Sequence, residues 1–283
     1  MRLMRMNLKN GQAQEIASDE GLAAGSPALA SDEKNCFYVA KGGVFSVNLT
    51  NLKSRRIYAL PVGSSAGDGF SISEDGQNAF LVERLGNRYK LMLIPLRGGS
   101  AAAAVESAEP ISDPMPRPHR AGVLYRRGTE IWLVNYDGAQ NRRLRLVTGG
   151  TGPALWSPDG RQVLYLNYPE DRKQLNSVRE ATPDTNEDRM VAPTSQFVGF
   201  SLNGDGSVIA GASGSKASPY VLLLLRSVRR ELTLCEHHSS DANLVRPVFA
   251  PDSRRLYFQS DRHGKLAIYS LNVERLVAET EVE

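Results

Sequence analysis

Short apolar runs recur along the chain, and each one follows a polar turn of similar composition. The clearest copy is Ser157 to Gly160 (Ser-Pro-Asp-Gly), which precedes the apolar run 163–166. Proline presets φ, aspartate accepts hydrogen bonds from nearby backbone, and glycine adopts positive φ, so this composition predicts a tight hairpin. Related turns precede four other apolar runs, at 36–39, 79–82, 208–211 and 256–259. The pattern of hydrophobic and polar positions therefore predicts a series of β-hairpins.

The aspartates of these turns give the length of the repeat. Asp32, Asp75, Asp159, Asp205 and Asp252 are separated by 43, 84, 46 and 47 residues. The separation of 84 spans two periods and predicts a degenerate copy over 117–125, where Arg-Pro-His-Arg-Ala-Gly replaces the usual turn. A period in the forties is the length of a propeller blade.

Each repeat has room for four strands. A second apolar run follows the first hairpin, as in 130–135, and a fourth strand-like segment follows it, as in 142–147. No helical period is sustained, so we predict an all-β fold, a single β-propeller over residues 1–283. The expected blades are 1–25 (partial), 26–66, 67–109, 110–152, 153–195, 196–242 and 243–283. Seven blades with an incomplete first blade are favoured over six. The polar stretch 176–194 is expected to be a loop excursion.

Composition and charge exclude several classes of protein. With 41% hydrophobic and 23% charged residues, the 283-residue chain can bury a core, and a net charge of +3 spread over isolated basic pairs gives no nucleic-acid surface. The apolar run 220–225 is too short to cross a membrane, and residues 1–8 lack a signal peptide. We expect a soluble, cytoplasmic protein unless a truncated N-terminus hides an export signal. Cys36 and Cys235 are expected to be free thiols.

Ligand-binding residues are expected where each blade begins, because the first strand of a propeller blade lines the central channel. The candidates at the rim of that channel are Asp68, Asp113, Gln196, Asp241 and Arg246. This set contains no histidine or cysteine, so it predicts neither catalytic residues nor a metal site. His237 and His238 are expected to be exposed loop residues, and His263 to make turn hydrogen bonds.

The repeats resemble the TolB-type, WD40-like propeller repeat, and the chain as a whole resembles bacterial oligogalacturonate lyases. The resembling segments include 3–11, 130–138 and 247–269. The resemblance implies β-elimination of short galacturonides from pectin. It also implies a Mn²⁺ ion held by three histidines and a glutamine, with an arginine as base.

Matched position by position, those functional residues are not retained. The first histidine falls on Gln196, the glutamine on Asp241, the other two histidines on Leu244 and Arg246, and the arginine near Glu130. Leucine has no ligand atom and arginine is a cation, so no cofactor is expected. We therefore predict a non-catalytic binding or scaffold module, in which Arg246 pairs with the carboxylate of an acidic oligosaccharide.

Two other functions stay open from the sequence. One is an active oligogalacturonate lyase, and the other is a TolB-like propeller that binds a protein partner. Neither nucleic acid nor membrane is expected among the partners.

Overall fold

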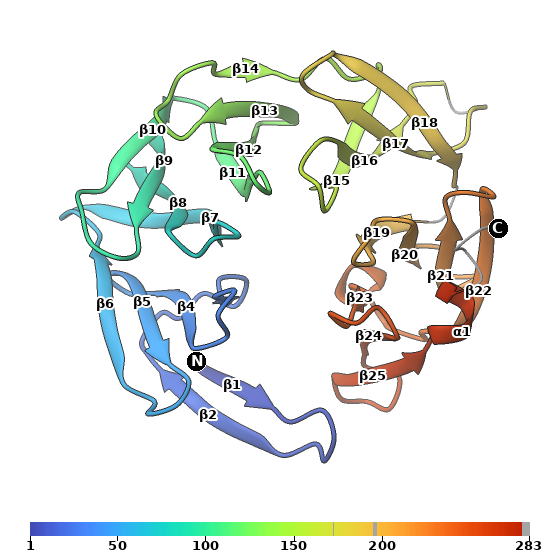
Figure 1. The fold of residues 1–283 in the computed structure, drawn as a ribbon, viewed down its shortest axis with the longest axis horizontal. Helices are drawn as coiled ribbons and strands as arrows, with labels where there is room; N and C mark the ends of the chain where they lie inside the picture. The colour runs from blue at the N-terminus through green and yellow to red at the C-terminus, as the bar shows by residue number, and fades with distance from the viewer. Residues whose placement is uncertain (172, 195–196, 279–283) are drawn as a thin grey trace. The chain divides into compact units, whose positions relative to one another are not determined.

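The computed structural model describes residues 1–171, 173–194 and 197–278, and these residues form β-strands with very little helix (Figure 1). They divide into two compact units, Met1–Leu144 and Arg145–Glu283. Within the described parts, the helical elements are the 3-10 turn η1 (Ala242–Leu244) and the short helix α1 (Glu274–Ala278). The predicted all-β class is confirmed.

The first unit contains a hairpin, a four-stranded sheet and an eight-stranded sheet. The hairpin pairs β1 (Arg2–Met6) with β2 (Ala13–Ser18). The four-stranded sheet has the order β3 (Ala28–Leu29), β4 (Asn35–Ala40), β5 (Gly43–Asn48), β6 (Ser54–Ala59). The eight-stranded sheet consists of β7 (Ser64–Ile72), β8 (Asn78–Leu85), β9 (Arg88–Pro95), β10 (Ala102–Ser107), β11 (Ile111–Pro116), β12 (Gly122–Arg127), β13 (Glu130–Asn135) and β14 (Arg142–Arg143).

The eight-stranded sheet is two antiparallel four-stranded groups joined at their first strands. β7 and β11 pair in parallel through Asp68 and Ser112. The second group begins with the degenerate repeat, and the expected hairpin is present as β11 and β12. His119 takes the place of glycine in its turn, with φ +58.

The second unit contains three sheets in chain order. Two have four strands each: β15 (Gly150–Trp156), β16 (Val163–Tyr168), β17 (Ser177–Thr182), β18 (Glu187–Pro193); and β19 (Phe197–Leu202), β20 (Val208–Ser213), β21 (Tyr220–Leu225), β22 (Arg230–Glu236). The third has three described strands, β23 (Val248–Phe249), β24 (Arg255–Ser260) and β25 (Ala267–Asn272). Repeated four-stranded antiparallel sheets are the blades of a propeller. The count of seven blades stays a prediction.

The repeated turn folds as its composition predicts. In the copy at 157–162, the Ser157 Oγ accepts the Gln162 backbone N–H (2.9 Å) and donates to Asp159 Oδ1 (2.6 Å). Asp159 Oδ1 also accepts the Arg161 N–H (3.0 Å), so two side chains close the hairpin between β15 and β16. The same three bonds recur between β7 and β8, where Ser73 Oγ donates to Asp75 and accepts the Asn78 N–H, and Asp75 accepts the Gln77 N–H.

The prediction of a loop excursion over 176–194 is wrong, because this stretch forms the antiparallel hairpin of β17 and β18. Its polar residues pair with one another across the two strands. Arg179 Nε lies 2.8 Å from Asp188 Oδ1, and Arg189 pairs with the buried carboxylate of Glu180. Charged residues that are paired in this way are compatible with a strand, although their composition is typical of a loop.

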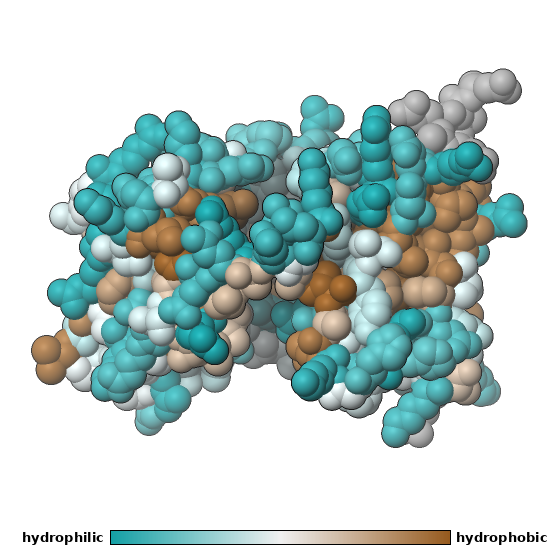
Figure 2. Space-filling view, turned by 90° about the horizontal axis from the view of Figure 1, so that it is seen from below, coloured by the Kyte–Doolittle hydropathy of each residue, from teal (hydrophilic) through white to brown (hydrophobic). Residues whose placement is uncertain are grey.

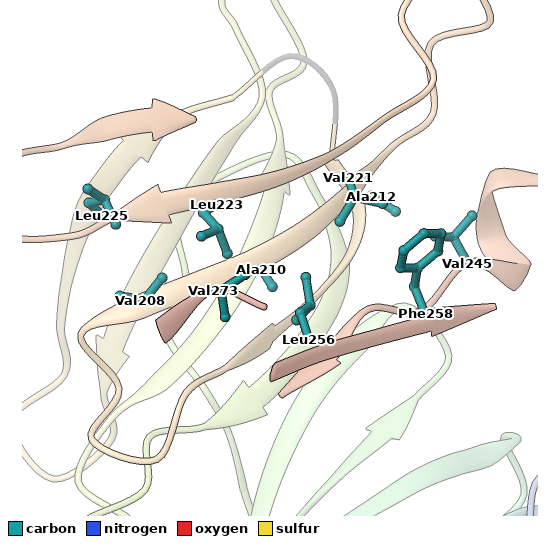
Figure 3. Packing of buried hydrophobic residues seen from close by; sticks show 10 residues of the cluster. All are labelled: Val208, Ala210, Ala212, Val221, Leu223, Leu225, Val245, Leu256, Phe258 and Val273. Carbon is teal, nitrogen blue, oxygen red and sulfur yellow. The ribbon is translucent and has the colours of Figure 1, made fainter. Parts of the chain in front are cut away.

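Apolar side chains between neighbouring sheets form the cores. In the second unit, Val208 and Ala210 of β20, with Leu223 of β21, face Leu256 and Phe258 of β24 (Figure 3). In the first unit an equivalent cluster joins β8 and β9 to β12 and β13. Burial of these apolar side chains stabilises the sheets that they join.

Hydrophilic residues cover most of the face drawn in Figure 2, and apolar residues interrupt it in separate groups. Within the described residues, no helix combines the length and the apolar character that crossing a membrane requires.

Candidate ligand-binding site

Four of the antiparallel four-stranded groups have a first strand that is irregular at the same place. Its pairing with the second strand shifts register at 66–70 in β7, 112–115 in β11, 151–154 in β15 and 197–199 in β19. Such bulges leave residues outside the ladder and turn their side chains in new directions. Two predicted site residues, Asp68 and Asp113, lie at these bulges, inside their strands rather than ahead of them.

In the first unit, the structure brings Asp68 and Asp113 to neighbouring strands. Asp68 pairs with Ser112, so the two aspartates are close along the β7–β11 ladder, and both are exposed. Asp113 has a left-handed backbone (φ +50), and its Oδ2 lies 3.3 Å from Nε of Arg126. An arginine that is mostly buried therefore holds one of the two carboxylates.

The second unit contains a polar pocket of about 590 Å³. One wall is the turn 213–219 between β20 and β21, and the other is the segment 237–243 between β22 and η1. Asp261 and Arg262, which follow β24, complete it. Of the predicted site residues, Asp241 lines this pocket, whereas Arg246 is not among its lining residues.

His237 joins the two walls of this pocket. Its Nε2 lies 3.0 Å from the Ser213 carbonyl oxygen, and its Nδ1 accepts the Ser239 backbone N–H at 3.0 Å. Because Nδ1 accepts, the ring is the neutral tautomer that donates from Nε2. Burial lowers the pKa of this imidazole, in agreement with that neutral form.

The prediction that His237 is an exposed loop residue is therefore wrong, since its exposed fraction is 2%. Its hydrogen-bonding neighbours Ser213 and Ser260 come from strands distant in the sequence. His238 is exposed as predicted, and its Nε2 lies 2.6 Å from Glu236 Oε2. His263 makes a hydrogen bond from its turn, with Nδ1 2.7 Å from the Tyr269 hydroxyl.

Most charged groups that line the pocket are already engaged within the protein. Asp261 accepts the backbone N–H (2.8 Å) and the hydroxyl (2.5 Å) of Ser240, and these bonds lower the pKa of its carboxyl group. Asp241 caps η1, accepting the backbone N–H and the side-chain amide of Asn243 at 2.9 Å each. Arg262 donates to the carbonyl oxygens of Glu236 and His237.

Lys216 also lines the pocket, and sequence reasoning missed it. It is exposed, and its ammonium group makes no hydrogen bond or ion pair with the described residues. The sequence does contain a feature that indicates this position, because Lys216 lies in the polar turn that joins two of the most apolar strands of the chain. The sequence did not place that turn beside residues 237–243.

Arg246 is held by a contact within its own segment. Arg246 has a left-handed backbone (φ +41), and its Nε donates to the Asn243 carbonyl oxygen at 3.4 Å. Gln196 is outside the described residues.

The residues at the positions that the resemblance assigns to manganese ligands do not fit that ion. Leu244 ends η1 and offers no ligand atom, and the Arg246 guanidinium would repel a cation. Asp241 could supply one carboxylate. Across the described residues, no three histidine, cysteine, aspartate or glutamate side chains are grouped so that they could hold a metal.

Known proteins resemble this chain along nearly its whole length. It is 21% identical over 318 residues to the oligogalacturonide lyase of Pectobacterium atrosepticum, covering 95% of this chain and 82% of that protein. A solved structure described as oligogalacturonate lyase in complex with manganese matches with a TM-score of 0.90 and 20% identity, over 98% of this chain and 84% of the other.

The TolB protein of Acinetobacter baumannii is more distant, with a TM-score of 0.58 and 15% identity over 85% of this chain and 60% of that one. No family model matches the chain. The β-propeller fold and the predicted resemblance to oligogalacturonate lyases and TolB-like propellers are confirmed.

Proposed function

We propose that this chain is a propeller that binds acidic oligosaccharides and does not carry out manganese-dependent elimination. The likeness to proteins described as oligogalacturonide and oligogalacturonate lyases, over about nine-tenths of the chain, supports a galacturonide as the ligand. The pocket of the second unit is lined by serines, an asparagine and charged side chains, which suit the hydroxyl and carboxylate groups of such a sugar.

The observation that carries the proposal is the set of residues beside that pocket. Asp241, Leu244 and Arg246 stand where the resemblance assigns metal ligands, and they do not form a cation site. Elimination beside a carboxylate needs an electrophile to stabilise the developing carbanion, and a metal ion supplies several kcal/mol of that stabilisation. Binding of the sugar does not need a metal ion.

Calorimetric titration tests this proposal. Digalacturonate is titrated into protein treated with a chelator, and neutral galactobiose is the matched control ligand. We expect saturable binding of digalacturonate at one site and much weaker binding of galactobiose. Absence of digalacturonate binding would refute the proposed function.

The alternative of an active lyase is tested in parallel. Digalacturonate is incubated with the protein and Mn²⁺, and ultraviolet absorbance follows the unsaturated product over a range of pH. We expect no rise in absorbance above that of the protein-free control. A rise that depends on the protein and on Mn²⁺ would establish the lyase instead.

A further inference from the structure

We propose that Lys216 is the residue that binds the carboxylate of the acidic ligand, taking the place that a metal ion occupies in a metal-dependent site. This inference rests on the proposed function and names the group that recognises the sugar. It differs from the sequence-based expectation, which gave that role to Arg246.

The backbone around Lys216 is held in place by a hydrogen-bonded turn. Ser215 N–H donates to the Ser213 side chain (3.1 Å), Ser218 N–H donates to the Ser215 carbonyl oxygen (3.3 Å), and Tyr220 N–H donates to that of Ser218 (2.8 Å). β20 and β21, which flank this turn, are buried. The ammonium group is therefore carried on a turn of fixed backbone, and ligand binding has to order only the side chain.

The facing wall is equally fixed. His237 bonds to Ser213 on one wall and to Ser239 on the other, while its own carbonyl oxygen accepts the Ser260 hydroxyl at 2.6 Å. Asp261 anchors Ser240 through two hydrogen bonds. Both walls are held by hydrogen bonds within the protein, which lowers the cost of binding.

Among the charged residues that line the pocket, Lys216 differs from the others in its contacts. Asp241, Asp261 and His238 each have a partner within the protein, and Arg262 is engaged with two carbonyl oxygens and lies 4.9 Å from the centre of the Tyr269 ring. Lys216 is the lining charge for which the described residues provide no partner. An ammonium group without a hydrogen bond or ion pair to the described residues is available to a ligand, and it binds an anion such as a carboxylate.

The other lining groups restrict the ligand to a polar one. Asn243 and the serines of both walls offer donors and acceptors for hydroxyl groups, and the lining residues described for the pocket include no phenylalanine, tyrosine or tryptophan. A sugar cannot stack on a ring there, so recognition depends on hydrogen bonds and charge. A carboxylated sugar satisfies both requirements.

Calorimetric titration of digalacturonate into three purified variants tests the inference. Lys216→Met removes the charge and keeps much of the side-chain volume. Lys265→Met is the matched control, because Lys265 is exposed in the same unit and does not line the pocket. Arg246→Gln tests the rival carboxylate-binding residue.

We expect Lys216→Met to weaken digalacturonate binding by roughly tenfold or more, the effect of losing one charge-assisted hydrogen bond. Lys265→Met should bind like the unaltered protein, and the affinity of the unaltered protein should fall with added salt. Circular dichroism checks that all variants are folded.

Three results would overturn the inference in distinguishable ways. If the unaltered protein binds digalacturonate and Lys216→Met binds it equally well, Lys216 is not the carboxylate-binding residue although the proposed function stands. A tenfold loss in Arg246→Gln alone would assign the carboxylate to Arg246. If the unaltered protein does not bind, both the inference and the proposed function fail.

Discussion

His237 is a buried side chain whose two ring nitrogens are both used within the protein. Replacing it by phenylalanine leaves the Ser213 carbonyl oxygen and the Ser239 N–H without their partner. Each unpaired buried group costs about 1–3 kcal/mol, so we expect His237→Phe to lower the free energy of unfolding by about 2–4 kcal/mol. Urea denaturation measures this free energy of unfolding. The control is His238→Gln, at an exposed neighbouring residue, which should change the free energy of unfolding by less than about 1 kcal/mol.

The stability that His237 provides should depend on pH. Burial lowers the pKa of its imidazole below the value of 6.5 that it has in the unfolded chain. Below pH 6.5 the imidazole is protonated in the unfolded chain but stays neutral in the folded protein. The contribution of His237 to the free energy of unfolding is therefore complete above pH 6.5 and declines as the pH falls towards the pKa of the folded state. The difference in unfolding free energy between the unaltered protein and His237→Phe should narrow from about pH 7.5 to pH 5. A constant difference would contradict the neutral, buried imidazole.

Ser157 stabilises the hairpin turn of the repeat. Ser157→Ala removes the acceptor of the Gln162 N–H and a donor to Asp159. We expect the free energy of unfolding to fall by about 1–3 kcal/mol, measured by urea denaturation. Ser227→Ala is the control, because this serine is exposed in a turn without that pattern, and it should leave stability within about 0.5 kcal/mol.

Among the elements, the parallel contact of β7 and β11 depends on one glycine. Gly69 has φ +128, and a Cβ there would lie 2.4 Å from Pro114 Cδ and 2.9 Å from the Asp113 nitrogen. Gly69→Ala should therefore separate the two strands and destabilise the protein by about 2–4 kcal/mol. Gly86→Ala is the control, because that turn glycine has positive φ (+59) but open space around it, and it should cost about 1 kcal/mol. Thermal unfolding compares the two variants, and equal losses would contradict the steric account.

The hairpins could be predicted from the sequence because their determinants are local. Ser157, Asp159 and Gly160 are close neighbours whose side chains close the turn themselves. The β17–β18 hairpin could not be predicted from the sequence, because it is stabilised by ion pairs such as Arg179 with Asp188, which form only once the two strands are aligned. Polar residues that pair across strands have the same composition as a loop.

The candidate site was only partly predictable for the same reason. Asp241 was found because it precedes a repeat, and it does line the pocket. Lys216 and His237 belong to segments about 20 residues apart, and their proximity follows from the alignment of β20, β21 and β22. No spacing rule in the sequence encodes the hydrogen bond between His237 and Ser213 that joins the two walls.

At the scale of the whole molecule, a fold can outlast the chemistry carried out on a related scaffold. The chain matches the fold of a manganese-bound lyase with a TM-score of 0.90, while Leu244 and Arg246 stand where metal ligands would be expected. The fold is maintained by buried apolar faces and repeated turns. Substitutions at exposed positions beside a pocket therefore leave the fold intact. Binding of an acidic sugar and its cleavage are therefore separable in this fold.

Metal analysis of the purified protein tests that separation most directly. The protein is equilibrated with excess Mn²⁺, passed through a desalting column, and its manganese content per chain is measured by mass spectrometry. We predict a content far below one ion per chain, because Asp241, Leu244 and Arg246 do not form a metal site. One manganese ion retained per chain would contradict the proposal that the protein binds the acidic sugar without a metal ion.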